Sequence, residues 1–140
     1  MKNRPVTTLF MLMSADGKIS TGADDSLDVD ADFPQIAGVR EGLHQYYEIE
    51  KTTDLWSINS GRVQAKIGVN QSDLPDKTPV SFVVIDNKNL TEHGVNYFCS
   101  LAKNFVIVTT NIEHPAFALQ HDNLHILCQE TLDLETMLTY

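Results

Sequence analysis

Short apolar runs recur along the chain and are separated by polar stretches. The run at residues 7–13 is continuous and far too short to cross a membrane, as in a strand buried on both faces of a parallel sheet. It predicts a central strand. Later runs predict further strands at residues 54–59, 80–85, 105–111 and 124–128.

The spacing of apolar residues between these runs predicts the connections. An amphipathic helix is expected over residues 34–51, because apolar positions recur there at helical spacing. A short helix is expected over residues 95–102, and another begins at Leu134, with Asp133 as its N-cap. Strands that alternate with helices predict an α/β fold of three α/β/α layers around a mainly parallel sheet.

Polar clusters directly follow three of the predicted strands. Ser14, Asp16 and Lys18 follow the first strand, residues 59–63 the second, and residues 86–87 the third. Because parallel strands have their carboxyl ends at one edge of the sheet, the three clusters are expected to bound a single crevice. The alternative for the first cluster is an ordinary Asp-Gly turn without a functional role.

The second cluster has features of a phosphate site. A turn that contains Gly61 can aim backbone amides at an anion, and the Arg62 guanidinium matches the geometry of phosphate oxygens. If the chain continues as a helix, Lys66 lies four residues further on the same face and adds a second cation. The alternative is a solvated surface turn that carries one arginine.

The composition and length of the chain limit which partners, domain organisation and cellular location are expected. The 140 residues carry a formal net charge of −9, and such an acidic chain is expected to bind neither nucleic acid nor an anionic membrane. The length suits one compact domain over residues 1–140, and no signal-peptide core or paired-cysteine motif is present. These features predict a cytoplasmic protein.

Patterns of other enzyme classes are absent or weak. The sequence contains no Gly-x-Ser-x-Gly elbow, Walker motif or Rossmann glycine fingerprint. His121 and His125 stand four residues apart with His114 nearby, which on a helix would suit a metal. The surrounding residues instead predict a loop that enters a strand, where positions four apart lie about 13 Å from each other. We therefore predict no metal site.

Four segments of the chain form a recognisable set: residues 4–9 (RPVTTL), 13–19 (MSADGKI), 53–63 (TDLWSINSGRV) and 83–87 (VVIDN). Together they resemble the riboflavin-pathway pyrimidine reductase family, the C-terminal reductase domain of the bifunctional deaminase/reductase. The resemblance covers nearly the whole chain. It implies a dihydrofolate-reductase-like fold and a cytoplasmic NADP-dependent oxidoreductase of riboflavin biosynthesis, which transfers hydride from NADPH to a small heterocyclic substrate, a ribosylamino-pyrimidine.

The resemblance also implies roles for individual residues. Asp16 and Lys18 take the catalytic positions, and Ser26 and Glu50 lie towards the substrate. The positions expected to bind the cofactor are Leu12, Met13, Ser14, Asp28, Gly61, Arg62, Val63, Lys66 and Asn87.

Departures from the family pattern lead to an alternative hypothesis. Arg62 replaces a family threonine, Lys66 and Ile67 replace two acids, and Glu50 stands where an arginine reads the substrate phosphate. The strand and glycine-rich loop that receive the cofactor pyrophosphate in the family belong to a later segment, so this chain is expected to lack the C-terminal strands of the fold. The alternative is a truncated, non-catalytic domain that folds and self-associates, as a homodimer, without productive nucleotide binding.

Overall fold

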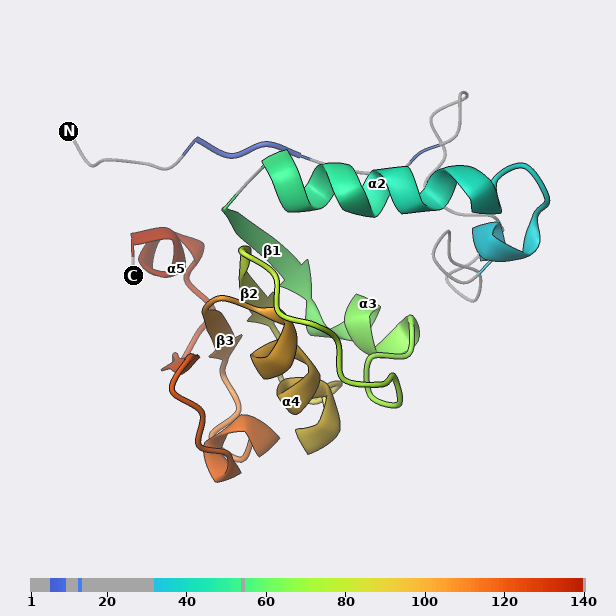
Figure 1. Cartoon of the computed structure of the whole chain (residues 1–140). Coiled ribbons are helices and arrows are strands. Elements are labelled where there is room, and N and C mark those ends of the chain that lie inside the picture. Colours follow the sequence, from blue (N-terminus) through green and yellow to red (C-terminus); the bar gives the residue numbers. More distant parts are fainter. Residues whose placement is uncertain (1–5, 10–12, 14–31, 54, 140) are drawn as a thin grey trace. The chain divides into compact units, whose positions relative to one another are not determined.

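The computed structural model describes residues 6–9, 13, 32–53 and 55–139 (Figure 1). The chain divides into two compact units. The C-terminal unit is described over residues 55–139, and the N-terminal unit over residues 6–9, 13 and 32–53. Each unit is described by itself.

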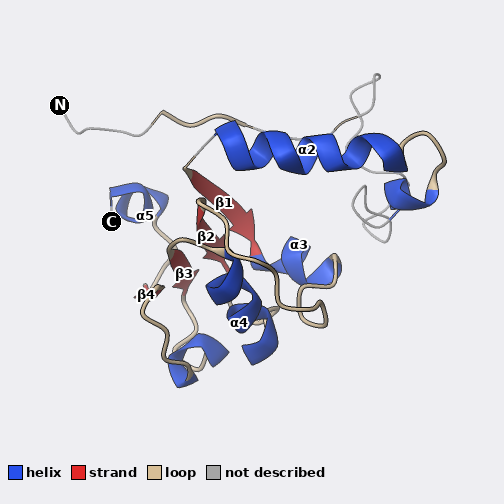
Figure 2. Cartoon of the chain, viewed as in Figure 1, coloured by secondary structure: helices blue, strands red, loops and turns tan. Residues whose placement is uncertain are grey.

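A four-stranded, all-parallel sheet forms the centre of the C-terminal unit (Figure 2). Its strands lie in the order β1-β2-β3-β4, and helical segments connect them. The predicted α/β class and the four later strands are therefore confirmed. The strands are β1 (Trp56–Ser60), β2 (Ser81–Ile85), β3 (Phe105–Thr109) and β4 (Leu124–Cys128).

The helical segments of this unit are α3 (Gly61–Lys66), α4 (Glu92–Leu101), the 3₁₀ helix η2 (Pro115–Ala118) and α5 (Leu134–Thr139). Helix α4 begins three residues before the predicted start, because the Thr91 hydroxyl accepts a hydrogen bond from the Gly94 amide at 3.3 Å. The predicted cap of α5 is present, since Asp133 Oδ1 accepts from the Glu135 amide at 3.0 Å.

One face of the sheet packs against all three connections between strands. Parallel strands in sequential order, joined by right-handed crossovers, place their connections on the same face. Val69, Phe98 and Ala116 come from the three successive connections, and all belong to one buried cluster with Phe105 and Ile107 of β3. Every residue of β3 is buried, as the apolar sequence of this strand predicts.

Aromatic packing fixes α4 on this face. The Phe98 ring has its centroid 5.6 Å from that of Phe82 on β2 and 5.1 Å from that of Phe105 on β3. The Phe98 side chain is 1% exposed. Helix α4 and the turn that precedes it are therefore anchored to the two central strands.

The N-terminal unit contains the 3₁₀ helix η1 (Phe33–Gln35) and helix α2 (Arg40–Thr53). The predicted start of the long helix near residue 34 is wrong, because Gly38 takes a φ of +86° between the two elements. This left-handed conformation ends one helical segment before the next begins. The Gly38 amide donates to Glu41 Oε2 at 2.6 Å, which connects the turn to the first turn of α2.

The predicted strand at residues 7–13 is not observed in the part of this run that is described. Residues 7–9 and 13 adopt no regular secondary structure, and residues 10–12 lie outside the described residues. Among the described strands, β2 and β3 occupy the central positions of the sheet. No described helix has both the length and the apolar character that a membrane span requires.

Candidate functional site

Polar residues gather at the carboxyl edge of the sheet, as predicted for the second and third clusters. Ser60 at the end of β1 pairs in register with Ile85 at the end of β2, which brings Gly61 beside Asp86. A Cβ atom on Gly61 would run into the Asp86 side chain. Glycine is therefore required at the start of α3 for this close approach.

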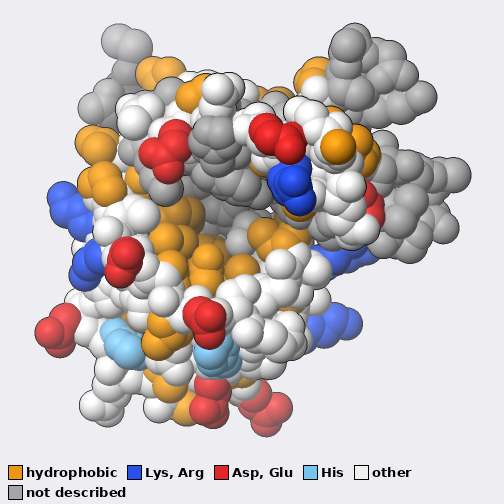
Figure 3. All heavy atoms as spheres, turned by 45° about the vertical axis from the view of Figure 1, so that its right-hand side comes forward, with side chains coloured by type: hydrophobic (Ala, Val, Ile, Leu, Met, Phe, Trp, Pro, Cys, Tyr) orange, Lys and Arg blue, Asp and Glu red, His pale blue; other side chains and the backbone are white. Residues whose placement is uncertain are grey.

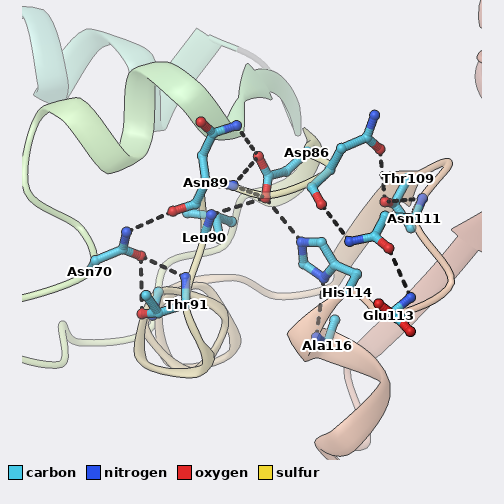
Figure 4. A network of polar contacts seen from close by, with 12 residues as sticks. Asn70, Asp86, Asn89, Leu90, Thr91, Thr109, Asn111, Glu113, His114 and Ala116 are labelled. Carbon is cyan, nitrogen blue, oxygen red and sulfur yellow. Dashed lines mark hydrogen bonds and ion pairs between the residues drawn. The ribbon is translucent and has the colours of Figure 1, made fainter.

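Asp86 is the centre of a buried hydrogen-bond network (Figure 4). Its side chain is 3% exposed. Its carboxylate accepts from the Asn89 amide at 3.1 and 3.0 Å, from the Asn89 side chain at 2.7 Å and from the Leu90 amide at 2.9 Å. These contacts close the turn between β2 and α4.

His114 completes this network from the segment that follows β3. Its Nδ1 atom accepts from the Ala116 amide at 3.1 Å, so in the neutral imidazole the proton lies on Nε2. Nε2 is 3.0 Å from Asp86 Oδ2 and donates to it. The side chain is buried and both ring nitrogens are occupied, so the pair acts as a structural connection between the ends of β2 and β3.

The network shifts the acidity of Asp86. Burial opposes ionisation of the carboxyl group, but the hydrogen bond with His114 and those from Leu90 and Asn89 favour the charged form. Together they lower the pKa of Asp86 from 3.8 to about 2. Asp86 is therefore a carboxylate at neutral pH.

Asn87 presents a polar group of fixed orientation next to this buried pair. Its Oδ1 atom accepts from Thr109 Oγ1 at 2.9 Å and from the Thr110 amide at 2.8 Å, and its carbonyl oxygen accepts from Asn111 Nδ2 at 2.7 Å. The exposed Asn87 amide is thus held by its oxygen, and its Nδ2 group meets no acceptor among the described residues. The edge offers a pre-oriented donor to a ligand.

Asn70 holds the same region from the connection between β1 and β2. Its Oδ1 accepts from the Thr91 amide at 3.0 Å, and its Nδ2 donates to the Asn89 carbonyl at 2.8 Å. A Cβ atom on Gly94 would meet Asn70 Oδ1, so glycine is needed inside α4. The turn that carries Asp86 and Asn87 is therefore fixed from two sides.

The two cations of the predicted phosphate site lie on α3. The segment after Gly61 is helical, so Arg62 and Lys66 share one face of a helix, and both are exposed. Val63, between them, is 41% exposed. Of the predicted cofactor positions, the structure brings Gly61 and Arg62 to the same sheet edge as Asn87.

Two other predicted positions belong to the N-terminal unit, which is described by itself. Met13 is exposed and Glu50 lies in α2, and both belong to the N-terminal unit. Six predicted site residues lie outside the described residues: Leu12, Ser14, Asp16, Lys18, Ser26 and Asp28.

The remaining histidines have separate surroundings. His125 lies on β4 and is exposed, whereas His121 precedes the strand and hydrogen-bonds through Nε2 with Asn96 Oδ1 at 2.7 Å. The predicted loop entering a strand is confirmed. In the part of the chain that the structure describes, no three His, Cys, Asp or Glu side chains gather in a way that suits a metal ion.

The chain matches no protein-family model, no curated protein and no solved structure. Its function therefore has to be inferred from the residues at the sheet edge. Sequence patterns identified Gly61, Arg62 and Asn87 as candidates there. They did not identify His114 or Asn70, whose partners lie 28 and 19 to 21 residues away along the chain.

A shallow, open hollow of about 760 Å³ lies beside the network. Leu90 and His114 contribute to its lining, together with the exposed side chains of Glu92, Glu113 and Phe117. The face of the molecule in Figure 3 carries scattered acidic and basic side chains among many uncharged ones.

Replacing Gly61 by alanine is expected to lower the free energy of unfolding by about 1–3 kcal/mol, because the new methyl group would displace the packed, hydrogen-bonded carboxylate of Asp86. Urea denaturation measures the change. The matched control is Gly42→Ala inside α2, where a Cβ atom meets nothing within 4 Å. The free energy of unfolding of that variant should rise by up to about 1 kcal/mol. Equal effects of the two substitutions would contradict the close contact at Gly61.

The lowered pKa of Asp86 predicts how stability responds to acid. Because the folded pKa is about 2 and the ordinary value is 3.8, the contribution is fully present above about pH 4 and is lost as the pH falls towards 2. The difference corresponds to about 2 kcal/mol. Unfolding free energies measured from pH 6 to pH 2 should fall more steeply for the native chain than for Asp86→Asn. Parallel profiles would argue against this assignment.

Proposed function

We propose that this chain is a dihydrofolate-reductase-like, three-layer α/β/α domain of an NADPH-dependent reductase that acts on a small heterocycle of the ribosylamino-pyrimidine class. The observation that carries the proposal is the fixed Asn87 amide at the same sheet edge as Gly61 and Arg62 at the start of α3. The likeness of four sequence segments to the pyrimidine reductases supports the choice of substrate class.

The chemistry of this edge suits the phosphate groups of a dinucleotide. Phosphate oxygens accept hydrogen bonds, and the edge supplies the Asn87 Nδ2 donor together with the cations Arg62 and Lys66 on α3. The nearby negative charge of Asp86 is buried and directed towards Asn89, Leu90 and His114.

The position of the edge also favours a ligand site. In α/β sheets, ligands bind outside the carboxyl ends of the strands, and these groups follow the ends of β1 and β2. The network around Asp86 fixes the end of β2 before a ligand arrives. A preformed arrangement reduces the entropy lost on binding.

When bound, NADPH would supply the hydride for the proposed reduction and leave as NADP⁺, and the substrate would also take up a proton. Asp16 and Lys18 are proposed as the catalytic residues, with Ser26 and Glu50 at the substrate. Leu12, Met13, Ser14 and Asp28 are proposed as further cofactor-binding residues. These assignments rest on the sequence resemblance.

A nucleotide titration tests the proposal. The affinity of the 140-residue chain for NADPH is measured by nucleotide fluorescence. We expect Arg62→Ala to lower this affinity by about ten- to a hundredfold, because the variant loses one charge-assisted contact of about 1.5–3 kcal/mol. The affinity for NADH, which lacks the 2′-phosphate, should fall by a smaller factor in the same variant. The matched control Lys103→Ala removes one exposed cation just before β3, at the opposite edge, and should leave both affinities unchanged.

The outcomes separate the alternatives. Equal losses for NADPH and NADH would exclude recognition of the 2′-phosphate by Arg62. If the native chain binds neither nucleotide at millimolar concentration, the reductase proposal fails for this chain. The second hypothesis, a non-catalytic domain without productive nucleotide binding, would then hold.

A further inference from the structure

We draw no further inference here: the strongest candidate, the shallow hollow between the β2–α4 turn and η2, is lined by two exposed glutamates and an exposed phenylalanine, and nothing in the described part of the structure shows what covers it, because its buried polar group, His114, is already paired with Asp86 and Ala116.

Discussion

Replacing Asp86 by alanine is expected to lower the free energy of unfolding by about 3–5 kcal/mol, because several buried donors lose their acceptor at once. The substitution deprives the amides of Asn89 and Leu90 and the Nε2–H group of His114 of their acceptor. Each buried donor without a partner costs about 1–3 kcal/mol. Urea denaturation followed by circular dichroism measures the loss.

Two further variants sharpen this test. Asp122→Ala removes an exposed carboxylate from the segment before β4 and should change stability by less than about 0.5 kcal/mol. Asp86→Asn keeps one acceptor oxygen but turns an NH₂ group towards existing donors, so an intermediate loss is expected. If Asp86→Ala costs no more than Asp122→Ala, the network does not hold the strand ends together.

Replacing Phe98 by alanine should destabilise the chain by about 3–5 kcal/mol, because the ring is 1% exposed and its removal leaves a cavity between α4 and the sheet. The ring contacts to Phe82 and Phe105 are lost together. Thermal unfolding measures the effect, and hydrogen exchange should show weaker protection of the α4 amides than in the native chain.

Phe117→Ala is the matched control for this substitution. Its ring is 47% exposed at the end of η2, so the same change of side chain should cost less than about 1 kcal/mol. Phe98→Leu should recover a large part of the lost stability, since it refills most of the volume with an apolar group. Similar losses for Phe98→Ala and Phe117→Ala would mean that α4 is not anchored through this ring.

Local patterns in the sequence were sufficient for most elements of the C-terminal unit. The runs that became β2, β3 and β4 are short, rich in β-branched and other apolar residues, and bounded by polar residues, so their length and composition favour strands over helices. The cap at Asp133 likewise depends on residues within one turn. The polar strand ends at Gly61 and Asn87 were recognisable because parallel strands end at one edge.

The boundaries of two helices required backbone conformations that residue type alone does not specify. Glycine tolerates both helical and left-handed backbone, and the chain uses it in both ways: Gly38 has φ +86° and separates η1 from α2, whereas Gly94 lies inside α4. The left-handed conformation of Gly38 makes the long helix begin later than predicted. Gly94 allows α4 to begin earlier than predicted, because Asn70 fills the space beside this residue, which has no side chain.

The polar network at the sheet edge was decided by tertiary structure. Asp86 reaches His114 across 28 residues, and Asn87 reaches Thr109 across 22, only because β2 and β3 are neighbours in a fixed register. Periodicity reports which face of an element is apolar, but it carries no information on which strands become neighbours. The orientation of the Asn87 amide, and with it the candidate ligand site, therefore emerges only when the strands have paired.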